Sequence, residues 1–293
     1  MDSYRIVRDP RYGYHRVDPV PSEEEVERYY AQEFYSTEYQ RFNDSSLGVQ
    51  QEEKEFFDSR WEDVCRHVQR HFGGIEGVSV FDVGFGFAQA LLYFKAKGMI
   101  AAGLEPSAEG VAYALEQGIE AYQGGIEEFE VVGDRRYQVV TLINVLEHLR
   151  FPQETLTSIR EELLAPGGML VIDVPNDYND FQTAAAAEYG LGEWWVCTPV
   201  HINYFDLKGL AKLLAECGYE VEYADASFPL EMFLLMGDVY VGDAELGKAC
   251  HEKRVRFESV LRRQGKAEKL QQFYAALAQL ELGRQLVVYA KPF

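Results

Sequence analysis

The chain has 293 residues, 47% of them hydrophobic, which is enough to bury the core of a sizeable α/β domain and an additional lobe. Its formal net charge is −20, and no lysine- or arginine-rich stripe offsets this acidity, so neither nucleic acid nor an anionic membrane is expected as a partner. The N-terminal segment is charged without an apolar stretch, and the longest apolar runs are too short to span a bilayer, so we expect a cytoplasmic protein.

The cysteines are Cys65, Cys197, Cys217 and Cys250, and they are widely spaced along the chain. No pair has the short spacing of a zinc knuckle, and a disulfide framework is not indicated either. We therefore predict reduced thiols and no metal site.

Residues 1–75 are predicted to form a helical lead-in that belongs to a substrate lobe. Ser22 stands three residues before Glu25, which is the capping-box pattern of a helix start. A second helix is predicted within residues 52–72, and the glycines at 73 and 74 end it. Its apolar stripe consists of Phe57, Trp61, Val64, Cys65, Val68 and Phe72.

Short apolar runs alternate with helical patterns over residues 76–227. Such alternation predicts βαβ units and a mostly parallel sheet. The expected strands lie at 78–84, 99–107, 119–125, within 137–149, and at 169–176 and 219–227. The expected helices lie at 88–98, 108–118, 153–164 and 207–218.

Residues 228–283 interrupt this alternation with two further helical patterns. One helix face carries Leu246, Cys250, Phe257 and Leu261, and the other carries Leu270, Phe273, Tyr274 and Leu277. The chain then closes with a strand at 284–293, which needs the sheet beside it. We interpret 228–283 as a helical insertion before the last strand, serving as a lid or as a dimer face. The fold class is thus α/β, with a seven-stranded, mostly parallel sheet and helices on both faces.

The stretch "DVGFGFA" at 82–88 follows the first strand of this sheet directly. Gly84 and Gly86 thereby lie at the carboxyl end of a parallel strand, where nucleotide-type cofactors bind. A dinucleotide fingerprint would have glycine or alanine at position 89, which is Gln89 here, and the lysine of a phosphate loop is absent. Glu105 ends the second strand and can accept two hydrogen bonds from a ribose diol. The alternative is a solvent-exposed acid at the end of a strand.

Four segments in order, "VFDVGFGFA", "GLEPS", "YQVVTLINVLEHL" and "LLAPGGMLVIDVPN", resemble the class I S-adenosylmethionine-dependent methyltransferases. More narrowly, the chain is similar to the small-molecule branch that includes ubiquinone-pathway O-methyltransferases and deoxysugar C-methyltransferases. The resemblance covers about residues 78–223 and the closing strand. It implies a Rossmann-like fold and S-adenosylmethionine as the cofactor.

The resemblance also implies which residues hold the methyl donor. Asp82, Gly84 and Gly86 would shape the loop beneath the methionine part of the cofactor, and Glu105 would bind the ribose hydroxyls. Asn144, which ends the fourth strand, would face the methionine end.

The segment "GGIEEF" at 124–129 corresponds to the adenine side of the family's site. The backbone of Ile126 would lie against the adenine ring. Gly125 stands where the family often has an aspartate, so Glu127 is a candidate to replace it in binding the adenine amino group. Ala88 replaces the usual third glycine, a change that a small side chain should tolerate.

The "LEHL" segment supplies Glu147 and His148 just beyond the methionine end of the cofactor. Histidine titrates near neutral pH, and an adjacent carboxylate can orient it. In similar deoxysugar enzymes a Glu-His pair at this motif lies in the active site, which predicts a catalytic role for both residues here. The alternative is that they cap or pack the following turn.

The segment "TPVHINYF" at 198–205 matches a "P-x-H-x-x-Y-F" element of the same branch. His201 is a second candidate base, and Tyr204 a candidate for binding an acceptor hydroxyl, although a structural role is the alternative for the histidine. Residues 176–195 have the length of a lid, with Trp195 as a substrate contact, or form a packed helix with at least one tryptophan in the core.

We therefore predict an S-adenosylmethionine-dependent methyltransferase that acts on a small polar metabolite, with a sugar or surface-glycan/secondary-metabolite precursor favoured. A homodimer is possible. Two alternatives remain open: a non-catalytic cofactor-binding or scaffold protein of the same fold, and an oxidoreductase that binds a NAD-type nucleotide.

Overall fold

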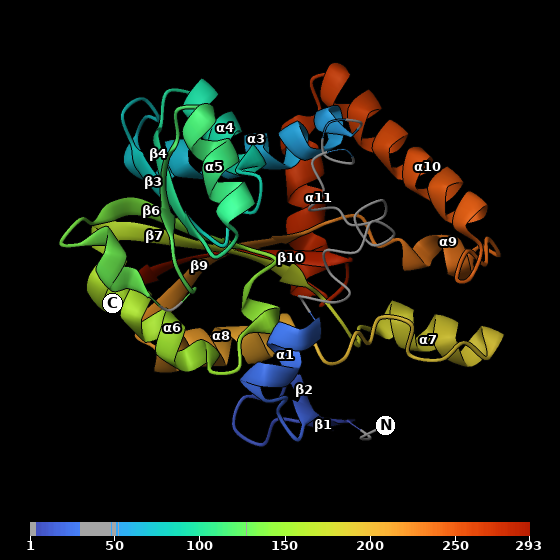
Figure 1. The fold of residues 1–293 in the computed structure, drawn as a ribbon. Helices are drawn as coiled ribbons and strands as arrows, with labels where there is room; N and C mark the ends of the chain where they lie inside the picture. Colours follow the sequence, from blue (N-terminus) through green and yellow to red (C-terminus); the bar gives the residue numbers. More distant parts are fainter. Residues whose placement is uncertain (1–3, 30–47, 49–50, 52, 127) are drawn as a thin grey trace.

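The computed structural model describes residues 4–29, 48, 51, 53–126 and 128–293 (Figure 1). Its main feature is a seven-stranded sheet in the order β5-β4-β3-β6-β7-β10-β9. Only β10 runs antiparallel to its neighbours, β7 and β9, while the β3–β4, β3–β6, β4–β5 and β6–β7 pairs are parallel. The predicted mostly parallel sheet is thus confirmed. The strands are β3 Ser79–Val83, β4 Ile100–Glu105, β5 Glu120–Gln123, β6 Tyr137–Ile143, β7 Leu164–Pro175, β9 Tyr219–Ala226 and β10 Gln285–Pro292.

Helices cover both faces of this sheet because its strands are apolar on both sides. Val80, Val139 and Val171 belong to one buried cluster, which includes side chains of α3, α4 and α5. The residues that alternate with them, such as Phe81 and Val140, belong to a second cluster with side chains of α6 and α8. These helices are α3 Lys54–Phe72, α4 Gln89–Ala96, α5 Ala108–Glu116, α6 Pro152–Ser158 with a π-helical turn Ile159–Leu163, and α8 Leu207–Glu216.

The N-terminal part differs from the helical lead-in that the sequence predicts. It begins with β1 Arg5–Arg8 and β2 His15–Asp18, which form a small antiparallel sheet with β8 Asn203–Tyr204. These strands are too short to give a periodic signal, and the partner of β2 lies far along the chain. The helix predicted after the capping box is present as α1 Glu23–Tyr29, and Glu25 Oε2 accepts from the Ser22 amide at 2.8 Å.

The helical insertion before the last strand is present as predicted. It contains α9 Glu231–Leu235, α10 Ala244–Arg263 and α11 Ala267–Gln279, between β9 and β10 (Figure 1). The segment predicted as a lid or packed helix forms α7 Asp180–Tyr189, which follows the carboxyl end of β7 and contacts α9. Two 3-10 turns, Phe129–Val132 and Leu146–His148, follow β5 and β6. None of the helices in the described residues is both long and apolar enough to pass through a membrane.

Candidate functional site

The glycine loop between β3 and α4 is a tight turn that depends on its small residues. Gly84 has a φ of 75°, and a Cβ atom there would lie 2.8 Å from Val145 Cγ2. Gly86 has a φ of 55°, and Ala88 holds the left-handed conformation at the N-cap of α4, with a φ of 56°. Gly84 is therefore required both by its backbone conformation and by the lack of space for a side chain, whereas Gly86 only has a conformation that favours glycine. Val145 brings the turn after β6 against the loop.

Asp82 lies beneath this loop rather than on its surface. Its carboxylate is buried, and Oδ1 accepts a hydrogen bond from Thr141 Oγ1 at 2.6 Å. Burial raises the pKa of Asp82 from 3.8 to about 7. This position fits the expected role of shaping the loop from below.

The buried state of Asp82 leads to a pH-dependent stability. Because the pKa in the folded protein, about 7, lies above the ordinary 3.8, the folded state holds the proton to higher pH than the unfolded chain does. The free energy of unfolding should therefore fall as pH rises through this window, by up to about 4 kcal/mol from this group. Asp82→Asn cannot lose a proton, and its amide oxygen can still accept from Thr141.

We expect Asp82→Asn to match the wild type in stability at about pH 4 and to be more stable at about pH 8. Urea unfolding at both pH values measures this difference. A difference between the two proteins that does not change with pH would contradict the expectation.

Glu105 is buried at the end of β4, so the alternative of a solvent-exposed strand-end acid is wrong. Its side chain is 9% exposed. Oε2 accepts from the Gly86 amide at 2.8 Å, and Oε1 accepts from the Ser107 amide at 2.9 Å. Burial raises the pKa of Glu105, and these two amides oppose the shift. The carboxylate thus ties the glycine loop to the start of α5, beside the place predicted for the ribose.

The adenine-side segment also borders the loop. The position of a Cβ atom on Gly84 is 3.6 Å from Ile126 Cδ1, so Ile126 lies next to the glycine turn. The Gly125 amide donates to Glu128 Oε2 at 2.8 Å. Glu127 lies outside the described residues. Glu128, which the sequence analysis did not single out, holds this segment in place.

Asn144 lies at the carboxyl end of β6 and is exposed, with a φ of 53°. Its backbone amide donates to the carbonyl oxygen of Asp173 at 2.8 Å, and its side-chain Oδ1 accepts from Gln285 Nε2 at 3.1 Å. Asn144 is thus held at the carboxyl edge of the sheet, one residue before Val145, which packs on the glycine loop.

Glu147 is the most deeply buried of the predicted catalytic residues. Its side chain is 2% exposed, and Oε2 has no hydrogen-bond partner among the residues that the structure describes. Burial raises the pKa of Glu147 well above its ordinary value, and the nearby carboxylates of Asp173 and Asp177 raise it further. A buried carboxyl oxygen without a hydrogen-bond partner lowers the stability of the fold. Such groups are typical of sites that bind a ligand.

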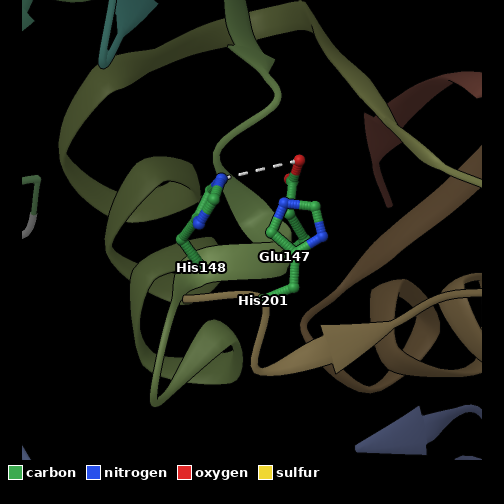
Figure 2. Close-up of side chains that lie close together, drawn as sticks. All are labelled: Glu147, His148 and His201. Atoms are coloured by element: carbon green, nitrogen blue, oxygen red, sulfur yellow. Dashed lines mark ion pairs between the residues drawn. The ribbon is translucent and has the colours of Figure 1, made fainter. Parts of the chain in front are cut away.

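His148 and His201 converge on this carboxyl group (Figure 2). His148 Nδ1 lies 3.0 Å from the carbonyl oxygen of Val200 and must donate to it, which leaves Nε2 as the acceptor nitrogen, 3.8 Å from Glu147 Oε1. The rings of His148 and His201 are 4.8 Å apart and nearly perpendicular. Burial lowers the pKa of His148 to about 4 and that of His201 to about 3, so both rings are neutral at physiological pH.

Hydrogen bonds hold the segment that carries His201 against the turn that carries Glu147. The Ile202 amide donates to the carbonyl oxygen of Glu147 at 2.8 Å. The side chain of Asn203 donates to the carbonyl oxygens of Leu149 at 2.7 Å and of Leu146 at 3.4 Å. Asn203 was not predicted as a site residue, although it lies within the "P-x-H-x-x-Y-F" element. The cluster is therefore fixed by backbone contacts from two distant parts of the chain.

Tyr204 and Trp195 lie in a separate small cluster with Val17 of β2. Tyr204 is buried, and its hydroxyl accepts from the Cys197 amide at 3.1 Å. Trp195 is also buried and packs edge-on against Tyr178, with ring centroids 5.3 Å apart. Trp195 thus occupies a packed position, as the alternative interpretation of this segment expects. The ring of Tyr204 lies 6.3 Å from that of His201.

A second group of buried charges at the same edge of the sheet was not predicted. Arg284 Nη1 lies 3.3 Å from Asp177 Oδ1 and 3.8 Å from Glu231 Oε1. Glu231 is fully buried, and Gln182 Nε2 also donates to Asp177, at 3.2 Å. These residues stand singly at the ends of elements, where no motif or periodicity marks them in the sequence.

Comparisons with known proteins show the family of the chain. A family model described as a methyltransferase domain matches residues 28–224. The ubiquinone biosynthesis O-methyltransferase of Klebsiella pneumoniae subsp. pneumoniae is 30% identical over 116 residues, which cover 38% of this chain and 48% of that protein. The protein of the same name from Salmonella newport is 31% identical over 116 residues, with the same shares of 38% and 48%. The chain thus spans about half the length of these curated relatives.

A solved structure shows the same fold. The magnesium protoporphyrin IX methyltransferase of Synechocystis PCC 6803, with bound SAH, aligns with a TM-score of 0.50 and 15% identity, over 69% of this chain and 92% of that one. At this identity the likeness concerns the fold, and it confirms the Rossmann-like arrangement expected from the sequence. The chain therefore belongs to the methyltransferase domain family, within the class I S-adenosylmethionine-dependent methyltransferases.

Proposed function

We propose that this protein transfers the methyl group of S-adenosylmethionine to a small polar metabolite, with a sugar or surface-glycan/secondary-metabolite precursor as the favoured acceptor. One observation carries the proposal. Glu147, His148 and His201 converge beside the glycine loop, since Val145, which packs on Gly84, begins the turn that carries Glu147 and His148. Polar groups that can activate an acceptor thus lie next to the predicted methyl donor site.

The proposed chemistry is a direct displacement. When bound, S-adenosylmethionine supplies a methyl carbon that its sulfonium already activates. The chain's own residues then need to align the acceptor atom, exclude water and lower the barrier to losing its proton. Glu147, His148 and His201 are the described side chains placed to bind and activate that atom.

We propose a division of the chain into four parts. Residues 76–227 would bind the cofactor, 1–75 and the insertion 228–283 would form the substrate lobe, and 284–293 would close the sheet. Within 1–75, however, α3 packs on the sheet itself, so the part before α3 is the better candidate for the lobe. The pairing of Arg284 with Glu231 supports this division, because it ties the insertion to the carboxyl edge of the sheet. Exposed apolar residues on α10 and α11, such as Phe257 and Phe273, support the insertion as a dimer face. Free cysteines support a cytoplasmic location.

The alternatives make different predictions. Membership of the family argues against a NAD-type oxidoreductase. A non-catalytic protein would bind the cofactor without turnover. The buried Oε2 atom of Glu147, which has no partner among the described residues, destabilises the fold and so favours a functional site over a non-catalytic one.

The test is release of S-adenosylhomocysteine. We expect the purified protein, incubated with S-adenosylmethionine and a panel of sugars, nucleotide sugars and phenolic metabolites, to release it faster with at least one acceptor than with none. Cofactor binding without turnover across the panel would favour the non-catalytic alternative.

A further inference from the structure

We propose that Glu147, His148 and His201 form a binding site for a first-row transition metal dication of the Zn²⁺ type. The spacing of the cysteines predicts no metal site, and these three residues come from two separate segments of the sequence. The fold brings one oxygen of Glu147 and one nitrogen from each histidine within 4.8 Å of one another (Figure 2). Two imidazoles and one carboxylate are a ligand set that zinc and non-haem iron sites use.

Two of the three side chains have a polar atom that makes no hydrogen bond within the described residues. Glu147 Oε2 is buried without a partner among the described residues, and so is His201 Nδ1. Zinc–ligand bonds of about 2.0–2.2 Å place neighbouring ligand atoms roughly 3–3.5 Å apart. Glu147 Oε1 and His148 Nε2 are already 3.8 Å apart, so small side-chain rotations bring the donors to an ion.

The surrounding groups orient the ligands in the manner of known metal sites. His148 donates its Nδ1 proton to the carbonyl oxygen of Val200 at 3.0 Å, which presents Nε2 to the cluster. A metal-bound histidine usually makes such a bond with its second nitrogen. The segment that carries His201 is fixed to the turn of Glu147 through the Ile202 amide and the side chain of Asn203. The site is thus held in place by its neighbours.

The charge of the neighbourhood favours a cation. Three carboxyl groups, those of Glu147, Asp173 and Asp177, are buried at this edge of the sheet. Arg60 pairs with Asp173 at 2.5 Å and Arg284 with Asp177 at 3.3 Å, while Glu147 itself has no such cation in the described part of the chain. A dication would neutralise this excess of buried carboxylates, whereas a carboxylate or phosphate ligand would add to it.

The role of the ion in catalysis rests on the proposed function, the transfer of a methyl group. A bound dication can coordinate an acceptor hydroxyl and lower its pKa, so that the alkoxide oxygen attacks the methyl carbon and the sulfonium leaves as a neutral thioether. The oxygen–carbon bond forms as the carbon–sulfur bond breaks, and the hydroxyl proton passes to solvent. In this arrangement His148 is a ligand and not the base.

Metal binding by the chain alone tests the site. We expect the chelator-treated protein to bind Zn²⁺ in calorimetry, and Co²⁺ with the visible absorption of a low-symmetry site. Glu147→Gln and His201→Ala should each weaken Zn²⁺ binding by at least about 100-fold. His71→Ala is the matched control, because His71 lies away from this cluster. Its Nδ1 pairs with Glu222 Oε2 at a distance of 3.1 Å. It should leave binding unchanged.

Unchanged binding in Glu147→Gln, or loss of binding in His71→Ala alone, would overturn the assignment, and so would the absence of Zn²⁺ binding by the wild type. Displacement of Co²⁺ by an equal concentration of Mg²⁺ would overturn the class of ion. Glu147→Gln replaces a buried carboxyl whose Oε2 has no partner among the described residues, so the thermal midpoint of the variant without metal should not fall, and this checks its folding. Calorimetry with S-adenosylmethionine on the same samples reports the proposed function separately from the metal site.

Discussion

Glu105→Ala is expected to weaken S-adenosylmethionine binding by at least about 100-fold, because the substitution removes two charge-assisted hydrogen bonds. The carboxylate holds the Gly86 and Ser107 amides at 2.8 and 2.9 Å, and in the proposed complex it also binds the ribose hydroxyls. Loss of Glu105 therefore removes a ligand contact and loosens the loop that carries the cofactor. Isothermal titration calorimetry measures the change.

Glu109→Ala provides the matched control, since Glu109 is an exposed acid in the first turn of α5. It should bind the cofactor as the wild type does. Urea unfolding of both variants separates a binding effect from a folding effect. Equal affinities in Glu105→Ala and the wild type would remove Glu105 from the proposed cofactor site.

His148→Ala is expected to lower turnover by at least about 100-fold and to leave the affinity for S-adenosylmethionine almost unchanged. The imidazole faces Glu147 and His201, whereas the cofactor is predicted to lie on the glycine loop. The variant therefore loses activation of the acceptor, either by the ring itself or by an ion that it holds. Release of S-adenosylhomocysteine with an acceptor of the wild type measures the effect.

The control for His148→Ala is again His71→Ala. His71 lies near Gly167, in the irregular stretch of β7 between Leu164 and Met169, and so at the amino end of the strand, opposite the carboxyl edge that carries the site. Its loss should leave turnover intact. If His148→Ala turns over at the wild-type rate, the role in activating the acceptor passes to His201.

Much of the fold follows from local patterns in the sequence. The strands β3, β4, β6 and β7 are short apolar runs followed by turns and amphipathic helices, and this alternation alone predicts a parallel sheet. The glycines of the loop are predictable for the same reason, because a strand that passes directly into a helix needs left-handed residues, as at Gly84 and Gly86.

The parts that were missed depend on contacts between distant residues. The hairpin of β1 and β2 is completed by β8, whose residues Asn203 and Tyr204 show no strand pattern. Sequence patterns predict Glu105 as a cofactor-binding residue, but they could not show that its carboxylate accepts a hydrogen bond from the Gly86 amide. Likewise, "LEHL" and "TPVHINYF" each supplied a histidine, but only the folded chain brings His148 and His201 together.

The single polar residues at the carboxyl edge were the hardest to predict. Asp177, Glu231 and Arg284 meet only because β7, α9 and β10 end or begin at the same place. Trp195 illustrates the reverse case, since an aromatic residue near a predicted site is as well suited to packing, and the fold buries it against Tyr178.

The most direct test asks whether the purified chain binds S-adenosylmethionine as its cofactor. Calorimetric titrations with S-adenosylmethionine, S-adenosylhomocysteine and NAD⁺ measure this. We predict saturable binding of both sulfur ligands, competition between them for the same site, and no binding of NAD⁺. Absence of binding by S-adenosylmethionine and its demethylated product, or displacement of either by NAD⁺, would contradict it.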